Sequence, residues 1–226
     1  MIELRDVRKS FNRGKPNEFT AVQGISLEIE AGKATVLKGP SGSGKTTLLS
    51  MIGCMSRPSA GRIWVRGREI TSLPERFLTE IRRRTFGFVF QQANLIRGIT
   101  ALENAVLPAY PIGESFATIR KRGLALFDRF GIRPKAESKA EWLSGGEAQR
   151  VVMVRALMND PAVIIADEPT AHLDTNLSRD FMDILAGLKE DGKTLLLASH
   201  DPLVSESRVV DRVVNLRDGR IDGGTG

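Results

Sequence analysis

The chain has 226 residues, of which 41% are hydrophobic, enough to build one sizeable core within the size range of a single domain. No apolar stretch approaches the roughly 18 residues of a membrane-spanning helix, so we expect a chain that does not cross a bilayer by itself. The net charge of +6 suits nucleic acid, an anionic membrane face or a nucleotide equally, so charge alone excludes none of these partners.

Three local features bear on where the protein works and on what its basic residues do. Residues 1–7 mix charges into an apolar alternation, unlike the unbroken apolar core of a signal peptide, so we expect no export signal. Cys54 is the only cysteine and cannot form an internal disulfide, which fits a reducing cytosol, and we expect its thiol to be buried and inert. The basic run 82–84 lacks interleaved aromatic residues, and we expect a solvated helix face there.

In chain order, the first predicted elements are two antiparallel strands. Residues 2–4 and 25–29 alternate at period two on either side of a turn region at 14–17, which indicates a small β layer. Later apolar segments alternate with helical stretches, the pattern of buried parallel strands in an α/β sheet. These segments are residues 34–37, 86–90, 163–166 and 194–198, with 213–216 as the expected last strand.

Residues 94–160 carry little strand signal. Apolar side chains recur there at helical spacing, which predicts a helical insertion: Phe116, Ile119, Leu126, Phe127 and Phe130. We therefore expect one domain over residues 1–226, with a nucleotide-binding core from 1–93 and 161–226 and a helical subdomain over 94–160.

A glycine-rich segment follows the expected strand 34–37 and leads into a helical stretch at 46–51. It fits the P-loop pattern, in which glycines let the backbone wrap phosphate oxygens with N–H groups. Lys45 would reach the β- and γ-phosphates, and Thr46 would hold Mg²⁺. The expected nucleotide-binding residues are Gly39, Pro40, Ser41, Gly42, Ser43, Gly44, Lys45, Thr46 and Thr47.

Two acids end the apolar strand 163–166. Asp167 would organise Mg²⁺ at the carboxyl end of the strand, beside the P-loop. Glu168 is suited to orient and polarise an attacking water. P-loops and such acids occur in transporters, motors, GTPases and kinases, so these two motifs alone do not choose among those classes.

A third motif lies between them. The sequence Leu-Ser-Gly-Gly-Glu occupies residues 143–147, with Ser144 as a plausible N-cap of a following helix, whose free N–H groups can bind an anion. With this motif the chain closely resembles the ABC ATPase family in motif order over essentially its whole length. The resemblance implies a P-loop NTPase core with a mixed, mainly parallel sheet, an N-terminal antiparallel β layer and a helical subdomain bearing the signature motif.

The resemblance also implies ATP as nucleotide, Mg²⁺ as cofactor, and a homodimer in the ATP-bound state. Its two chains would pack head to tail, so that the signature of one closes on ATP held by the P-loop of the other. The residues acting in trans would be Ser144, Gly145, Gly146 and Glu147. Gln91 would contact Mg²⁺ or water and sense a membrane subunit, and Gln92 is the weaker choice because it lies further from the strand.

Four further assignments rest on the same resemblance. His200 would contact the γ-phosphate, Asp174 would form the D-loop, and His172 would be structural or interfacial. Phe11 occupies the place of an adenine-stacking aromatic, often tyrosine in the family, and Phe19 is its rival. Ala148 after the signature is a further departure, but none removes a catalytic group, so both sites of a homodimer should be competent.

Residues 86–96 and 100–104 resemble the branch that includes lipoprotein-release and macrolide-export ATPases. This implies an ATPase subunit powering export, or lipoprotein or envelope-substrate movement, through separately encoded membrane permease subunits. It would be cytoplasmic and peripheral on the inner face of the cell membrane. A regulatory ATPase coupled to a membrane complex remains an alternative. A soluble nucleic-acid or ribosome-associated protein is disfavoured, because there is one P-loop and no sustained heptads, and we expect no nucleic-acid partner.

Overall fold

The strands fall into two sheets. The computed structural model describes residues 1–171 and 173–222, so the expectation for His172 lies outside the described residues. An antiparallel sheet has the order β2-β1-β4-β5, and a mainly parallel sheet has the order β10-β9-β3-β8-β7-β6. The strands are β1 (Ile2–Phe11), β2 (Phe19–Ile29), β3 (Ala34–Lys38), β4 (Ala60–Val65), β5 (Arg68–Glu69), β6 (Phe86–Val89), β7 (Val163–Asp167), β8 (Thr194–Ser199), β9 (Arg212–Arg217) and β10 (Arg220–Ile221).

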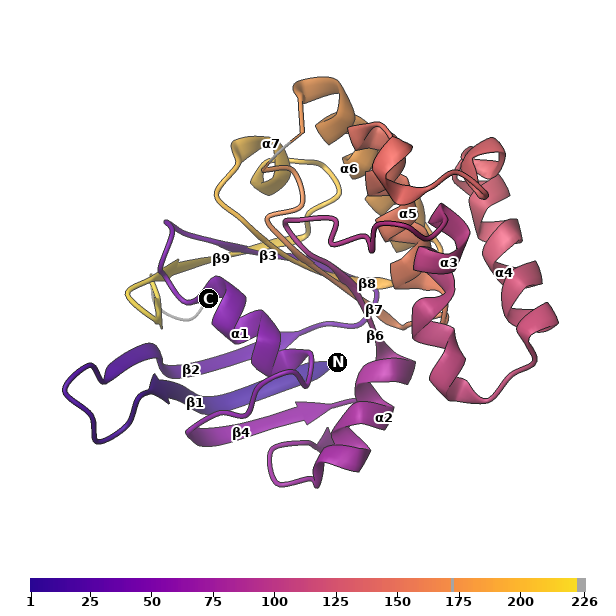
Figure 1. Ribbon diagram of the computed structural model, residues 1–226. Helices are drawn as coiled ribbons and strands as arrows, with labels where there is room; N and C mark the ends of the chain where they lie inside the picture. The colour runs from indigo at the N-terminus through magenta and orange to yellow at the C-terminus, as the bar shows by residue number, and fades with distance from the viewer. Residues whose placement is uncertain (172, 223–226) are drawn as a thin grey trace.

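Helices separate and flank these sheets. The helix α1 lies between the two sheets, and α3, α4 and α5 gather at one side (Figure 1). The helices are α1 (Lys45–Ile52), α2 (Glu75–Thr85), α3 (Ala101–Val106), α4 (Phe116–Arg129), α5 (Gly145–Leu157), α6 (Thr175–Glu190) and α7 (Pro202–Ser205), with 3-10 turns η1 (Leu107–Ile112), η2 (Arg133–Lys135) and η3 (Ala140–Trp142). In the described part of the chain, no helix has both the length and the apolar character needed to cross a membrane.

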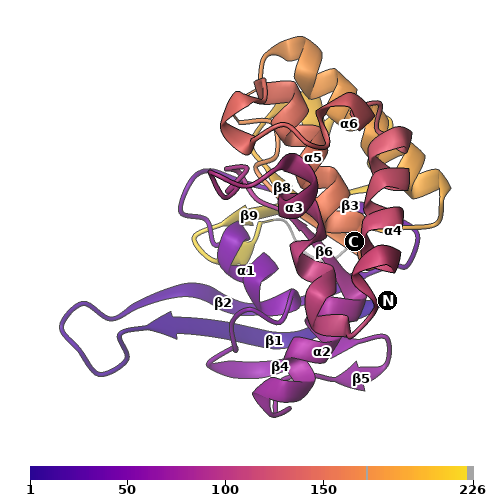
Figure 2. The same cartoon turned by 45° about the vertical axis from the view of Figure 1, so that its right-hand side comes forward.

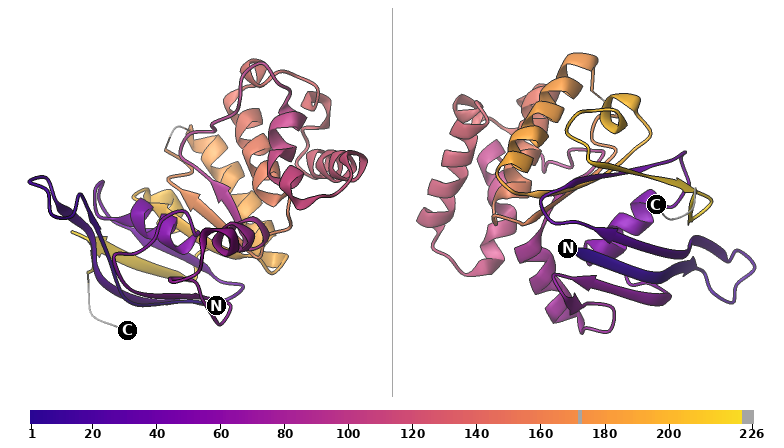
Figure 3. Two further views of the ribbon diagram at one scale, coloured as in Figure 1. Left: turned by 60° about the horizontal axis from the view of Figure 1, so that its bottom comes forward. Right: turned by 180° about the vertical axis from the view of Figure 1, so that it is seen from behind.

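Strand alternation divides the interior into two cores. In β3, Leu37 belongs to the core between the sheets, whereas Val36 belongs to the core on the opposite face of the parallel sheet. In β7, Ile165 and Ile164 divide in the same way. Because successive strand side chains point to opposite faces, the continuous apolar runs follow from a sheet that is covered on both sides. The helices α5 and α6 cover the second face (Figure 3).

The parallel order fixes where the loops meet. The strand β3 pairs with β8, and β8 pairs with β7, all in the same direction. The segments after these three strands therefore emerge at one edge of the sheet, where ligands bind in open α/β sheets. The sheet order thus brings together the glycine-rich loop, the acid pair and His200.

The expected fold class is confirmed, with local corrections. The N-terminal strands are longer than predicted and form a hairpin that projects from the body (Figure 2). The expectation that 213–216 is the last strand is wrong, because β10 follows and pairs antiparallel with β9. The strand β6 ends at Val89, and β4 and β5 were not predicted. Residues 94–160 contain helices and turns, while their status as a separate subdomain stays a prediction.

Candidate functional site

The glycine-rich loop between β3 and α1 is shaped by close backbone approaches. A Cβ on Gly39 would lie 2.2 Å from the carbonyl oxygen of Leu216. Gly44 has φ +98°, and a Cβ there would lie 2.4 Å from the carbonyl oxygen of Ala21. Contacts this short exclude any larger residue without backbone movement, so these two glycines hold the loop tightly between neighbouring segments.

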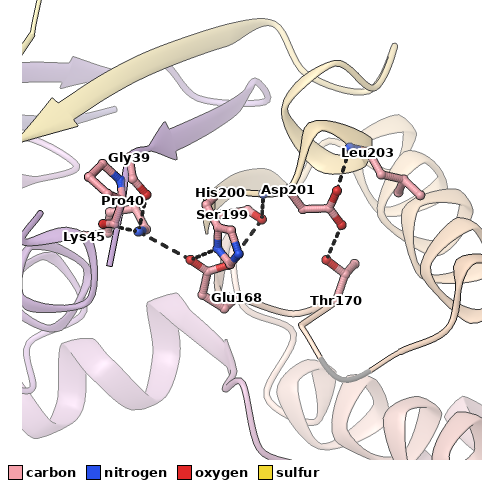
Figure 4. Close-up of polar contacts among 9 residues, drawn as sticks. All are labelled: Gly39, Pro40, Lys45, Glu168, Thr170, Ser199, His200, Asp201 and Leu203. Atoms are coloured by element: carbon pink, nitrogen blue, oxygen red, sulfur yellow. Dashed lines mark hydrogen bonds and ion pairs between the residues drawn. The ribbon is translucent and has the colours of Figure 1, made fainter. Parts of the chain in front are cut away.

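Lys45 begins α1 and points into the loop that precedes it. Its Nζ donates to the carbonyl oxygens of Gly39 at 2.7 Å and Pro40 at 3.1 Å (Figure 4). The same ammonium lies 3.4 Å from Oε1 of Glu168, and the Lys45 side chain is only 6% exposed. A nearly buried cation is thereby fixed beside the loop amides, which is the charge arrangement that phosphate binding requires.

Asp167 ends β7 beside Thr46 and Lys45. Burial raises the pKa of its carboxyl, while a hydrogen bond with Thr46 opposes that shift. Among the described residues, its buried Oδ1 has no hydrogen-bond partner. A hard carboxylate oxygen next to a threonine hydroxyl is the donor set that Mg²⁺ prefers, so these residues fit the expected ion.

Glu168 is the centre of a polar cluster. Its backbone lies in the left-handed region at φ +46°, and its N–H donates to the carbonyl oxygen of Ala198 at 2.8 Å. Both of its carboxylate oxygens lie 3.0 Å from Nδ1 of His200, and the Ser199 hydroxyl donates to Oε2 at 3.3 Å (Figure 4). A strained residue held by several contacts is characteristic of functional sites.

Sequence reasoning missed the residues that support this cluster. The Ser199 hydroxyl also accepts from the backbone N–H of Asp201 at 3.1 Å. Asp201 in turn caps α7 through Leu203 and accepts from the Thr170 hydroxyl at 3.2 Å. The sequence Ser-His-Asp at the end of β8 could have indicated Ser199 and Asp201. The partner Thr170 lies 31 residues from Asp201, and no local sequence pattern indicates it.

A cavity of about 440 Å³ opens over these residues. The glycine-rich loop, Gln91, Glu168 and His200 line it, and Gln92 does not. Phe19 also lines it, whereas Phe11 does not; the Phe11 ring is stacked on Phe19, with 5.2 Å between the ring centres. Among the described residues, the lining is Phe19, Ala21, Pro40, Ser41, Gly42, Ser43, Gly44, Lys45, Thr46, Thr47, Gln91, Glu168 and His200.

The Leu-Ser-Gly-Gly-Glu motif lies elsewhere in the chain. Ser144 is the N-cap of α5 in a capping box: its Oγ accepts from Glu147 N–H at 3.3 Å, and its own N–H donates to Glu147 at 2.8 Å. That backbone donor holds the pKa of the Glu147 carboxyl below its usual value. No residue of this motif lines the cavity. Asp174 caps α6 by accepting from the N–H groups of Asn176 and Leu177, both at 2.9 Å.

The site as a whole can bind a nucleoside triphosphate and cleave it. The loop and Lys45 offer positive charge to phosphates, Asp167 and Thr46 fit Mg²⁺, and Glu168 can accept a proton from water. The helix α5 presents a second set of backbone donors away from the cavity, at a helix N-terminus where the first N–H groups lack intrahelical partners.

Comparison with known proteins supports this interpretation of the site. A family model described as ABC transporter matches residues 22–171. An uncharacterized ABC transporter ATP-binding protein of Thermotoga maritima is 39% identical over 99% of this chain and 94% of its own length. The macrolide export ATP-binding/permease protein MacB of Hyphomonas neptunium is 40% identical over the whole chain, which spans only 35% of that protein.

Solved structures extend the likeness. The dimeric structure of MJ0796, a bacterial ABC transporter cassette, matches with TM-score 0.89 and 38% identity over 99% of this chain and 97% of that one. A post-hydrolysis state of the same cassette, bound to ADP and Pi, matches with TM-score 0.88 and 38% identity. The chain therefore belongs to the ABC transporter family, as an ATP-binding cassette that hydrolyses ATP.

Proposed function

We propose that this cassette works as a head-to-tail homodimer that powers export, or the movement of lipoprotein or envelope substrates, through separate membrane subunits. The observation that carries the proposal is that the nucleotide cavity and the signature motif lie in different parts of one chain. Lys45, Glu168 and His200 meet at the nucleotide cavity, whereas the N-terminus of α5 is presented away from it. A second copy can bring its own α5 to the cavity, which completes the site.

Each residue then has a role. The loop and helix start from Gly39 to Thr47, including Lys45, hold the phosphates. Thr46, Asp167 and Gln91 would hold Mg²⁺, which when bound neutralises charge on the phosphate oxygens. Glu168 orients water for in-line attack and takes up its proton, while Ser199 and His200 fix the direction of its carboxylate. In the reacting state, His200 also stabilises the transferring phosphoryl group.

The residues acting in trans would be Ser144, Gly145, Gly146 and Glu147. In the capping box the Ser144 hydroxyl only accepts, from the Glu147 N–H, so its O–H stays available to donate. That O–H and the N–H groups of Gly145 and Gly146 at the helix start can then donate to phosphate oxygens of the other copy. Asp174, at the start of α6, would lie at the same interface.

The surface for the membrane partner would be a second cavity of about 400 Å³, between α2, β6, η1 and the end of α5. Its lining is largely apolar and includes Met55, Phe88 and Phe90, directly before Gln91. A cytoplasmic segment of the membrane subunit seated there would lie next to the nucleotide site, so the cassette would sit peripherally on the inner membrane face.

The Glu168→Gln variant tests the function. The amide keeps the shape of the side chain and cannot accept a proton, so hydrolysis should fall by at least about a hundredfold. ATP binding should persist, and ATP-bound dimers should accumulate, as seen by size-exclusion chromatography with light scattering. Glu137→Gln, in an exposed ion pair with Arg120, is the matched control and should hydrolyse ATP normally. Normal turnover by Glu168→Gln would refute the assigned role.

The trapped variant also tests the partner. Purified with Mg-ATP from detergent-solubilised native membranes, it should bring a membrane protein with few spanning helices and a large outer domain. Recovery of ribosomal proteins or nucleic acid in its place would reject the transport function.

A further inference from the structure

Trp142 is the most exposed large apolar side chain that the structure describes, at 69% of its full accessible area. It stands two residues before Ser144, in the turn η3 that leads into the signature helix. The ammonium of Lys139 lies over the ring, with its Nζ 5.8 Å from the ring centre. An indole left this open at a functional turn is costly to hydrate and is suited to stack on another surface.

The backbone that carries Trp142 is firmly held. The Trp142 N–H donates to the carbonyl oxygen of Lys139 at 3.0 Å, and Ala140 N–H donates to Ile99 at 3.1 Å. The carboxylate of Glu141 accepts from Gly98 N–H at 3.1 Å. These bonds tie η3 to the segment before α3, so the ring is presented from an ordered turn.

The side chains of residues 142–144 differ in exposure. Leu143 has φ −80° and ψ 139°, and Ser144 has φ −65° and ψ 164°, so both are extended. Trp142 itself belongs to the 3-10 turn η3. Leu143 packs against the core, whereas Trp142 and Ser144 are both exposed. A surface that meets Ser144 therefore lies within reach of the indole two residues earlier.

The nucleotide cavity offers a matching aromatic surface. Phe19 lines the cavity and is 55% exposed. The Phe11 ring is stacked on it, with the ring centres 5.2 Å apart and an interplanar angle of 18°. Within one chain this stacked pair can cover only one face of a base.

Building on the proposed head-to-tail pairing, we infer that Trp142 of one copy closes over the nucleoside held at Phe19 of the other. The base then lies between aromatic groups from two chains. Ser144 and its helix start meet the terminal phosphate, and the exposed Trp142, two residues earlier, meets the nucleoside end. Base–aromatic stacking strengthens binding without reading base edges, so Trp142 makes dimer closure depend on a base as well as on phosphates.

Fluorescence can follow this contact directly. The sequence holds two tryptophans, Trp64 and Trp142, so a Glu168→Gln, Trp64→Phe chain reports on Trp142 alone. Mg-ATP should change its emission over the same concentrations that produce dimers. In a Glu168→Gln background, Trp142→Ala should raise the ATP concentration for half-maximal dimer formation roughly tenfold, and Trp142→Phe by less. Phe116→Ala, which removes an aromatic ring 59% exposed on α4, is the matched control and should change nothing.

Mixed dimers test that the contact is made in trans. In one mixture, a Lys45→Ala chain supplies Trp142 to a Trp142→Ala chain that holds ATP. In the other, a Lys45→Ala, Trp142→Ala chain meets a chain that has both residues. All chains carry Glu168→Gln, and bound ATP is counted in dimers isolated with two different tags. The first mixture should form at lower ATP than the second.

Four results overturn the inference. Dimers that form at unchanged ATP concentration with Trp142→Ala, or with unchanged Trp142 emission, show that the ring makes no contact. The reverse order of the two mixtures places the ring in the same chain as the ATP it touches. If Glu168→Gln chains bind ATP but never pair, the proposed dimer itself fails, and the inference fails with it.

Discussion

At the scale of single residues, Ser199 holds the carboxylate on which hydrolysis depends. Its side chain is fully buried, and its hydroxyl both donates to Glu168 and accepts from Asp201 N–H. In Ser199→Ala, the Glu168 carboxylate loses one of its fixed donors. We expect kcat to fall about tenfold with little change in KM, and stability to fall by about 1 kcal/mol.

Steady-state kinetics and urea unfolding measure these two effects. Ser205→Ala is the matched control, because that buried hydroxyl has no hydrogen-bond partner among the described residues. It should leave kcat unchanged. Equal kcat in both variants would show that Ser199 has only a packing role.

Cys54 should make the stability of the folded chain depend on pH in the alkaline range. Burial raises the pKa of its thiol from 9.0 to about 11. Between those values the unfolded chain has lost the proton while the folded chain keeps it, so stability falls as pH rises from 9 to 11. We expect a loss of about 2 kcal/mol across that window. Urea unfolding at several pH values checks it, and Cys54→Ala, which removes the titrating group, should show a shallower decline.

At the scale of elements, two capping boxes allow cap stability to be separated from catalysis. Ser144 with Glu147 begins α5, and Thr100 with Glu103 begins α3 by the same pattern of bonds. Ser144→Ala and Thr100→Ala should each lower the free energy of unfolding by about 1 kcal/mol. Only Ser144→Ala should also suppress ATP hydrolysis, because only that helix start is proposed to meet phosphate. Urea unfolding and ATPase rates test both, and normal hydrolysis by Ser144→Ala would contradict the proposed role of α5.

The helix α5 also shows where sequence prediction ends. Its motif and its N-cap were readable, because a capping box is a local pattern of residues three apart. Its contacts were not: Arg155 donates to the carbonyl oxygens of Ala93 and Asn94, and Gln149 donates to Pro169. These bonds tie the signature helix to the segments after Gln91 and after Glu168. They join residues 20 to 62 positions apart and have no spacing that a sequence reveals.

The strands likewise differ in how well the sequence predicts them. The segments 34–37, 163–166 and 194–198 were predicted because buried parallel strands are continuous apolar runs. The strand β4 was missed although Ile63 and Val65 alternate with Arg62 and Trp64, since the segment is short and begins with Ala60 and Gly61. For the base, the family resemblance favours Phe11, whereas the cavity is lined by Phe19, and the choice between the two rings stays a prediction.

At the scale of the whole molecule, the nucleotide cavity and the proposed partner surface are separate, so a substitution can impair one without the other. Met55 lines the second cavity, is 44% exposed, and lies outside the lining of the nucleotide cavity. In Met55→Glu, a carboxylate enters a largely apolar lining, and burying it against a partner would carry a large desolvation cost. The isolated variant should bind and hydrolyse ATP normally, because no nucleotide-cavity residue changes.

Recovery of the membrane partner distinguishes the two surfaces. With Glu168→Gln as the trap, Met55→Glu should lose at least about tenfold of the co-purifying membrane protein, since replacing an apolar interface contact by a charge that must be desolvated costs more than about 1.4 kcal/mol. Val213→Glu places the same charge on a comparably exposed apolar site of β9, 39% exposed, and should keep the partner. Unchanged recovery with Met55→Glu would exclude the second cavity as the docking surface, and the ATPase roles of Lys45 and Glu168 would stand independently of it.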